Sequence, residues 1–487
     1  MTGLAGAGAS GIADYAALLA NPAGLGWIQA SSFSGAFNTG ITADRASSSI
    51  SGFTPNNMQV VIANASLGNM AYVYRAPTRR GSFVAAVAFN QVHSFNQELD
   101  FYGTNSSSTI TTSFLPFDGE YSLSGDELDT LDDLPYAAFN AGLVEFYPEL
   151  LQSNPNAYPF LEAVVPGQPI DQSGKILQEG TVHEISFGAA IEIARNVMTG
   201  VSINIPFGRY DFNSTFREDD TGNLHTADDY SVLLDSGRLL EGFDHLSYRQ
   251  SLQSILAGVN VRAGLSAGLS SNLRLGLTIE TPTVYTIEET FRTRYFTRFD
   301  DGATLEYGGR DDDIGNGFYD YEILTPWRVS AGLQYESGML TLLADAEFVS
   351  WSQMRFEAKT DQAFFDDLNR GIDENYTGTI NPRVAAEVRL GAFELRGGAA
   401  LKQDPRKTAP RRSDGSLMDR DRIYYTAGLG YNISKRFRID VGWIGTQFDS
   451  AYHAYPEDDA GPRQDAGLQI DERITQDHVV LGATYWF

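Results

Sequence analysis

Large apolar side chains recur at every second position at the end of the chain. In an extended segment they share one face, and they are Val479, Leu481, Ala483, Tyr485 and Phe487. This alternation is typical of a β-strand whose two faces meet different surroundings. It suits the last strand of a membrane barrel and a strand of a soluble sheet alike, so the other segments decide between the two.

Alternating segments of this kind recur along the whole chain, and the connections between them alternate short and long. The predicted strands are 31–41, 57–75, 81–96, 181–194, 198–212, 253–267, 272–285, 323–336, 339–351, 380–390, 393–402, 421–432, 436–449 and 472–487. An even strand number with short turns at one end and long loops at the other is typical of bacterial outer-membrane barrels. We therefore predict an all-β fold, a fourteen-stranded antiparallel transmembrane barrel with both termini on the periplasmic side.

The two faces of the predicted strands differ as a barrel requires. In 436–449, for example, Phe437, Ile439 and Val441 alternate with Arg438 and Asp440. The apolar face suits lipid, and the opposite face places charged side chains in a polar, ion-paired lumen. A soluble two-sheet sandwich would reverse these faces, but the regular alternation of short and long connections favours the barrel.

The first thirty residues differ from the rest. A Gly/Ala-rich lead is followed by helical spacing from Ile12 to Leu19, which Asn21 and Pro22 end. We predict that 1–30 forms a plug inside the barrel, with a disordered or periplasmic tail as the alternative. The barrel then spans 31–487, and its long extracellular loops are 97–180, 213–252, 286–322, 352–379, 403–420 and 450–471.

Composition narrows the class of protein. The 487 residues carry 35 Lys and Arg against 62 Asp and Glu, a net charge of -27, which argues against nucleic-acid binding. No stretch approaches the ~18 consecutive apolar residues of a spanning helix. The absence of Cys excludes disulfides and thiolate metal sites. No secretion signal opens the sequence, so we expect that one precedes it or has been removed.

The loop 97–180 is strongly acidic, with a concentration of acids at 126–133. No cofactor is predicted, although calcium at these acidic outer loops is one interpretation and binding of a surface protein partner is another. The spacing lacks the glycine-centred geometry of a dedicated calcium loop. An ordinary solvated surface is the simpler interpretation.

The same loop carries apolar residues at near-helical spacing. The candidate outer hydrophobic groove, which would first receive a ligand, consists of Phe139, Leu143, Phe146, Tyr147 and Leu150. Packing of these side chains onto the rim of the barrel is the alternative.

A basic cluster begins another outer loop. The candidate contacts to lipopolysaccharide phosphates are Lys402, Arg406, Lys407, Arg411 and Arg412. The alternative is a solvated charged loop. The six His residues show no metal-ligand spacing, and no Ser/His/Asp set is recognisable, so we predict that the protein is not an enzyme.

The N-terminal segment resembles the hatch of the FadL family of outer-membrane long-chain fatty acid transporters. The run from Gly6 to Leu25 carries the resemblance, and its Asn21-Pro22-Ala23 is similar to the hatch motif of the family. Segments 325–335 and 345–352 also resemble strands of the family. The resemblance implies passive uptake of hydrophobic molecules past a gating hatch made of Asn21, Pro22 and Ala23.

In the family, ligand is captured at the outer loops, reaches a pocket above the hatch and leaves sideways at a kink in the third strand. The corresponding strand here, 81–96, has no Gly or Pro inside it to predict a kink. The resemblance also implies that Tyr485 and Phe487 lie at the periplasmic aromatic girdle and form the signal read by the barrel assembly machinery. The alternative function is a barrel of the same kind that acts as a structural or secretion-associated partner of other proteins.

Overall fold

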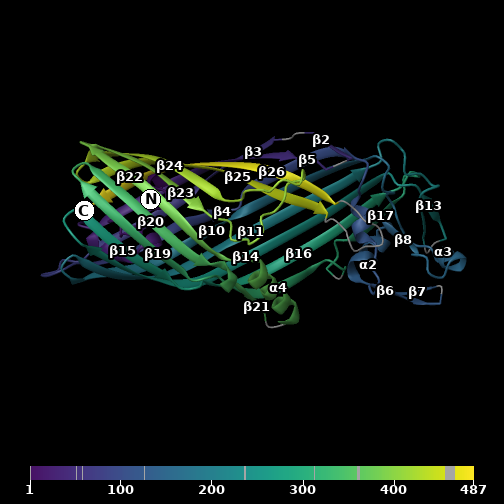
Figure 1. Cartoon of the computed structure of the whole chain (residues 1–487), viewed down its shortest axis with the longest axis horizontal. Coiled ribbons are helices and arrows are strands. Elements are labelled where there is room, and N and C mark those ends of the chain that lie inside the picture. The colour runs from purple at the N-terminus through teal and green to yellow at the C-terminus, as the bar shows by residue number, and fades with distance from the viewer. Residues whose placement is uncertain are drawn as a thin grey trace.

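The computed structural model describes residues 2–50, 52–56, 59–125, 127–234, 237–311, 313–358, 362–455 and 467–487. Within these ranges, antiparallel strands form a long barrel, and Figure 1 shows both chain ends toward one end of it. Short helices and hairpins gather at the opposite end. The predicted loop 450–471 lies partly outside the described residues, at 456–466.

Fourteen strands close the barrel within the described part of the chain. They are β1 (Ser32–Ser47), β3 (Gln59–Arg75), β4 (Phe83–Ser94), β10 (Ile170–Ala194), β11 (Val197–Asp219), β14 (His245–Gly268), β15 (Leu273–Glu280), β19 (Arg328–Ser337), β20 (Leu340–Ser350), β22 (Gly378–Leu390), β23 (Phe393–Lys402), β24 (Arg422–Ser434), β25 (Phe437–Tyr455) and β26 (Leu468–Trp486). Each pairs antiparallel with the next, and β26 pairs with β1 from Ser32↔Trp486 to Ser47↔Asp471. The predicted fourteen-stranded antiparallel barrel is confirmed.

Further strands extend the wall away from the chain ends. They are β2 (Phe53–Asn56), β5 (Gln97–Asn105), β16 (Val284–Arg298), β17 (Thr304–Gly308), β18 (Gly317–Leu324) and β21 (Arg355–Glu357). β16 continues the pairing with β14 beyond β15, and β18 pairs with β16. By contrast, β20, β22, β23 and β24 have no such extension, so the wall is lower on their side (Figure 1).

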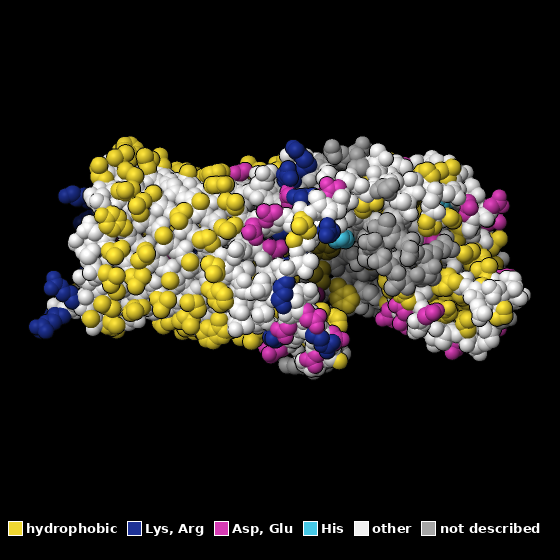
Figure 2. Space-filling model, in the orientation of Figure 1, with side chains coloured by type: hydrophobic (Ala, Val, Ile, Leu, Met, Phe, Trp, Pro, Cys, Tyr) yellow, Lys and Arg dark blue, Asp and Glu magenta, His cyan; other side chains and the backbone are white. Residues whose placement is uncertain are grey.

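The outer surface of the lower barrel is apolar. Along β25, Ile439, Val441 and Trp443 are exposed, whereas Arg438 and Asp440 form ion pairs inside the lumen. Figure 2 shows hydrophobic side chains over this half of the molecule and charged ones beyond it. Exposed apolar side chains outside and ion pairs inside are the arrangement that the alternating pattern predicts for a barrel in lipid.

The turns at the end near the chain termini are tight. β19 and β20 are joined at Gly338, and β22 and β23 at Gly391, with φ of 60° and 64°. Glycine adopts this left-handed conformation without the steric cost that other residues incur. These short connections fix the register of the strand pairs that form the lower wall.

The N-terminal segment lies inside the barrel. It contains η1 (Thr2–Leu4), α1 (Ala17–Ala20) and η2 (Pro22–Trp27). Leu18 and Leu25 are fully buried against Val73 of β3 and Val84 of β4. We call residues 2–30 the hatch. No helix in the described ranges is long and apolar enough to cross a bilayer.

The long loops pack together as a cap over the far end of the barrel. Its elements are η3 (Ile110–Phe114), β6 (Tyr121–Ser124), β7 (Glu127–Leu131), α2 (Asp133–Asn140), β8 (Val144–Phe146), α3 (Pro148–Ser153), β9 (Phe160–Glu162), β12 (Ser231–Leu233) and β13 (Leu239–Glu241). Phe114, Phe160 and Phe243 belong to its apolar core, which continues onto Tyr295 of β16. Another loop holds η4 (Trp351–Gln353) and α4 (Gln362–Asn375) at the side of the barrel (Figure 1).

Candidate functional site

Asn21 joins the hatch to the barrel wall. Its side chain is fully buried, and its Nδ2 donates to the Ala9 carbonyl at 2.7 Å and to the Leu265 carbonyl of β14 at 3.0 Å. Its Oδ1 accepts from the Ala23 N–H at 3.0 Å and so caps η2. One amide therefore satisfies groups of the hatch and of the wall together, which makes Asn21 more than a helix stop.

Pro22 and Ala23 follow at the start of η2 and are both buried. They lie against Gly200 of β11, where a Cβ atom would come within 2.6 Å of the Pro22 carbonyl group and of the Ala23 nitrogen. The wall thus approaches the backbone of the predicted hatch motif as closely as glycine permits. A gating role for Asn21, Pro22 and Ala23 remains a prediction.

A second anchor comes from Asp345 on β20. Its Oδ2 accepts from the Gly8 N–H at 2.5 Å and from the Ala9 N–H at 2.7 Å. Hydrogen bonds to an ionised carboxylate are stronger than neutral ones. Asp345 lies within a segment that resembles a family strand, but nothing in its spacing from residues 8 and 9 indicates that they meet.

Glycines of the wall leave room for the hatch. A Cβ at Gly276 would lie 1.9 Å from the Ala9 carbonyl oxygen, and one at Gly332 would lie 2.8 Å from the Ser10 nitrogen. Similar contacts occur at the following lumen-facing positions: Gly188, Gly264, Gly398 and Gly428. Each of these glycines falls on the lumenal parity of its strand, so alternation identifies the face but not the segment that fills it.

The wall is broken between β3 and β4. Their pairing runs only from Arg75↔Val84 to Asn69↔Asn90, although both strands continue. The register of β3 with β1 shifts next to Gly68, and the register of β4 with β10 shifts at Val92, since Val182 pairs with His93 and His183 with Gln91. β-Bulges bend a strand without requiring Gly or Pro, which is why the sequence of 81–96 does not predict this break.

Side chains replace the missing backbone bonds across the break. Asn64 Nδ2 donates to Ser94 Oγ at 3.3 Å, and Ser66 Oγ donates to Gln91 Oε1. Beyond it, Gln97 Nε2 donates to Asp44 Oδ2 of β1 at 3.0 Å. A wall held by side chains opens at lower cost than a strand ladder, because no row of backbone groups loses its partners.

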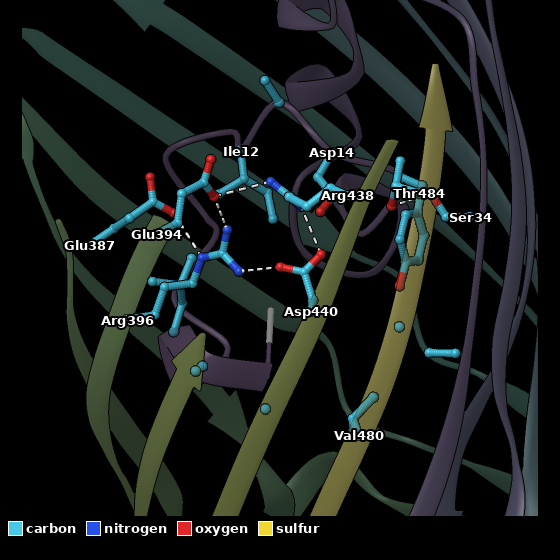
Figure 3. Close-up of a pocket in the computed structure, with 18 of the residues that line it drawn as sticks. Ile12, Asp14, Ser34, Glu387, Glu394, Arg396, Arg438, Asp440, Val480 and Thr484 are labelled. Carbon is cyan, nitrogen blue, oxygen red and sulfur yellow. Dashed lines mark hydrogen bonds and ion pairs between the residues drawn. The ribbon is translucent and has the colours of Figure 1, made fainter. Parts of the chain in front are cut away.

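Below the hatch, toward the chain termini, lies a polar cavity of about 400 Å³. Figure 3 shows Arg396 and Arg438 between Glu387, Glu394 and Asp440 in its wall. Arg396 contacts Glu387 Oε2 and Asp440 Oδ1 at 2.8 Å each, and Arg438 contacts Glu394 Oε2 at 3.1 Å. With Arg389, which pairs with Glu387 at 2.9 Å, three guanidinium groups balance three carboxylates. An ion-paired floor of this kind offers little apolar surface to a hydrophobic ligand.

The candidate outer groove residues lie in the cap. Leu143 is fully buried in the apolar core, Phe146 packs against it, and Tyr147 donates from its hydroxyl to the Ser231 carbonyl at 2.6 Å. Phe139 and Leu150 are half-buried. The structure thus shows Leu143 and Phe146 packed in the cap, and capture of a ligand by the five residues remains a prediction. Burial raises the pKa of Glu145, next to them, to about 7.

The candidate lipopolysaccharide contacts are not one cluster. Arg406 and Lys407 are exposed near α4, where Lys407 Nζ donates to the Asp373 carbonyl at 2.8 Å. Arg411 donates to the Gly415 carbonyl at 2.7 Å, and Arg412 is ion-paired with Asp449. Lys402 lies on the lumenal face of β23, because it shares parity with Arg396. A lipopolysaccharide contact at the exposed positions remains a prediction.

Tyr485 and Phe487 lie on the outer surface at the end of β26, with 45% and 57% of their surface exposed. Their rings are stacked at 6.3 Å, and Phe487 also lies 6.1 Å from the Tyr72 ring. Such a group of aromatic rings suits a membrane interface. Recognition by the assembly machinery remains a prediction.

The acidic outer loops are the predicted location for calcium. Over the ranges that the structure covers, no three His, Asp or Glu side chains are grouped so as to hold a metal ion. Asp126, one of the acids at 126–133, lies outside those ranges.

Comparison with known proteins gives likeness in structure but not in sequence. No protein-family model and no curated protein matches the chain. A FadL homologue from Pseudomonas aeruginosa matches over 99% of this chain and 96% of its own, with a TM-score of 0.54 and 13% identity. A deletion mutant of the TodX monoaromatic hydrocarbon channel matches over 99% of both chains, with a TM-score of 0.50 and 13% identity.

The toluene transporter TbuX from Ralstonia pickettii matches over 97% of this chain and 94% of its own, with a TM-score of 0.47 and 14% identity. At identities this low, a structural match shows the fold and not the ligand or the mechanism. The first two comparisons show that the chain has the fold of the FadL-type channels over nearly its full length.

Proposed function

We propose that this FadL-like barrel is a channel rather than an enzyme, through which hydrophobic small molecules such as long-chain fatty acids cross the outer membrane without energy input. The break between β3 and β4 carries the proposal. It lies at the bulges next to Gly68 and at Val92, directly beyond the stretch of wall against which Leu18 and Leu25 of the hatch are packed. A movement of the hatch would therefore change the packing at the edge of the opening.

The surroundings of the break suit an apolar ligand. Val92 is 44% exposed beside it, and the Phe95 ring lies 4.8 Å from the Tyr210 ring. Below the hatch, by contrast, Arg396 and Asp440 belong to a lattice of ion pairs. To continue along the barrel axis, a hydrophobic molecule above the hatch would have to move from an apolar surface to a charged surface. This transfer is unfavourable. We therefore propose a sideways exit.

The orientation follows from the same proposal. The chain ends and tight turns face the periplasm, and the cap faces outward, because short turns lie on the periplasmic side in barrels of this kind. Tyr485 and Phe487 then lie at the inner interface and act as the assembly signal. The hatch ends at residue 30 and the barrel begins at residue 31. Asn21, Pro22 and Ala23 are the gating residues of the hatch. Phe139, Leu143, Phe146, Tyr147 and Leu150 receive the ligand only if the cap loosens.

Uptake of labelled oleate by cells tests the proposal. Cells without a fatty acid channel of their own would carry the wild type, a variant lacking residues 1–25, or no barrel. We expect specific uptake with the wild type and a non-specific leak with the truncated barrel, measured with a labelled sugar of similar size. Equal, oleate-specific uptake by both proteins would contradict a gating role for the hatch.

A further inference from the structure

The tight turns at the end of the barrel near the chain termini carry positive charge only. The turns that join wall strands at this end are 76–82, 195–196, 269–272, 338–339, 391–392 and 435–436. Their charged residues are Arg79, Arg80, Arg195, Lys435 and Arg436, and they contain no Asp or Glu. The whole chain, by contrast, carries 62 Asp and Glu against 35 Lys and Arg. We call these five residues the basic rim.

The basic rim occupies one side of the barrel. Around the wall, β24, β25, β26, β1, β3, β4, β10 and β11 follow one another, so the three basic turns are consecutive. The three uncharged turns join β14 to β15, β19 to β20 and β22 to β23 on the other side. There, Leu269 and Met339 are 60% and 61% exposed. The cationic side is the one that carries the break between β3 and β4.

The chain supplies no counter-ion to the basic rim. All five side chains are exposed, and over the ranges that the structure describes none of them forms an ion pair. Glu192 lies beside the turns, where its N–H donates to the Ser82 carbonyl at 2.9 Å and its Oε1 accepts from the Asn196 N–H at 3.0 Å. These bonds hold two of the basic turns together. Figure 2 shows Lys and Arg side chains projecting from this end of the molecule.

The basic rim lies directly beside the apolar outer surface. Ile433 comes two residues before Lys435 and is 53% exposed, and Ile193 comes two residues before Arg195 and is 57% exposed. Two residues span about 7 Å along a strand. Lys and Arg stems cover apolar surface while their charged ends reach outward. The charges therefore stand at the depth where lipid hydrocarbon gives way to headgroups.

We propose that the basic rim binds the phosphate groups of anionic phospholipids in the periplasmic leaflet of the outer membrane. The proposal rests on the orientation given under the proposed function, in which the tight turns face the periplasm. Arginine binds phosphate through its planar fork, and lysine adds a point charge. Basic residues beside a membrane-spanning segment attract anionic lipids. The phosphates supply the negative charge that the turns lack, on the side of the barrel below the break.

A lipid surface fits the basic rim better than an acidic protein does. The five charges are spread along an arc at one depth, beside apolar side chains, and are not gathered in a pocket. On the opposite side, Leu269 and Met339 offer nothing to a phosphate and suit hydrocarbon. The contact with anionic lipid is therefore one-sided.

Lipid binding by the purified full-length protein in non-ionic detergent tests the site, with native mass spectrometry as the readout. The probes are dioleoyl phosphatidylglycerol, which is anionic, and dioleoyl phosphatidylcholine, which has the same tails and is zwitterionic. We expect the wild type to bind the anionic lipid about tenfold more tightly. R79Q/R80Q and K435Q/R436Q should each lose about fivefold of that affinity and bind the zwitterionic lipid as before. R79K/R80K, which keeps the charge, should retain the preference.

The matched control is R406Q/K407Q, which removes two exposed charges from an outer loop and should keep the preference of the wild type. Equal binding of the two lipids by the wild type would overturn the lipid site, as would an unchanged preference in both rim variants. Tight binding of soluble polyglutamate by the wild type, without a preference between the lipids, would overturn it in favour of an acidic protein partner.

A separate measurement tests the orientation on which the site rests. Ser271 is exposed in an uncharged turn, and the natural chain has no Cys. In S271C, a thiol reagent too large for outer-membrane pores should react only after the membrane has been permeabilised. Labelling in intact cells would overturn the orientation, and with it the assignment to the periplasmic leaflet.

Discussion

Asn21 of the hatch and Gly264 of β14 fit together without space for a side chain. A Cβ at Gly264 would lie 1.9 Å from Asn21 Oδ1, the atom that accepts from the Ala23 N–H. The hydrogen bond that Asn21 forms at the start of η2 is therefore possible only because residue 264 of the wall has no side chain. Because Asn21 also bonds to Leu265, the wall fixes both the position and the orientation of its amide.

Gly264→Ala should loosen the hatch. The added methyl group displaces the Asn21 side chain, and overpacking of this kind costs about 1–3 kcal/mol. Hydrogen exchange at the Ala23 amide, followed by mass spectrometry, should become faster by about tenfold or more. Gly397→Ala on β23 is the control, because a Cβ there meets nothing nearer than the Thr426 carbonyl at 3.8 Å. Unchanged exchange in Gly264→Ala would show that the hatch does not depend on this fit.

Asp345→Ala should release the other end of the hatch. It leaves the Gly8 and Ala9 N–H groups without their acceptor, at a cost of about 1.5–3 kcal/mol. We expect exchange at these two amides to rise while the barrel keeps its melting temperature within a few degrees, which circular dichroism measures. Asp320→Ala, at an exposed position on β18, should change neither. Retained protection at Gly8 and Ala9 would refute the anchor.

The cap should lose stability as the pH rises. Burial raises the pKa of Glu145 from 4.5 to about 7. A carboxyl group with a raised folded pKa favours the folded state when protonated, so its contribution is complete below about pH 4.5 and is lost as the pH passes about 7. Hydrogen exchange in β8 should therefore accelerate between pH 5 and pH 8 beyond its intrinsic pH dependence. In Glu145→Gln this additional acceleration of exchange should disappear. If it persists, a group other than Glu145 causes the pH dependence.

Alternation along single strands predicts the barrel because the residue types of each strand indicate which of its faces meets lipid and which meets the lumen. The alternation in 436–449 separates lipid from lumen, and Ile439 and Asp440 lie accordingly in the structure. The same parity places Lys402 with Arg396 on the lumenal face, so assigning it to an outer lipopolysaccharide site overlooked a signal that was present. Periodicity read strand by strand is reliable here because register and burial are coupled.

Contacts between segments that are distant in the sequence could not be predicted from it. Leu143 becomes part of a core that includes Phe243 and Phe299, and nothing within the loop 97–180 indicates those neighbours. The bulges next to Gly68 and at Val92 depend on how β3 and β4 meet β1 and β10. Features made by two distant segments have no local signature, whereas each strand carries its own.

Exit of the ligand through the break between β3 and β4 can be tested by closing the break with a covalent link. Cells carrying N64C/S94C would be treated with a short thiol-reactive cross-linker, and uptake of labelled oleate would be compared with that of the wild type. The control is D211C/Q253C, which joins β11 and β14 where their ladder is intact; the natural chain has no Cys. We expect cross-linking to abolish uptake only in N64C/S94C. Full uptake by cross-linked N64C/S94C would show that the ligand does not leave through this break.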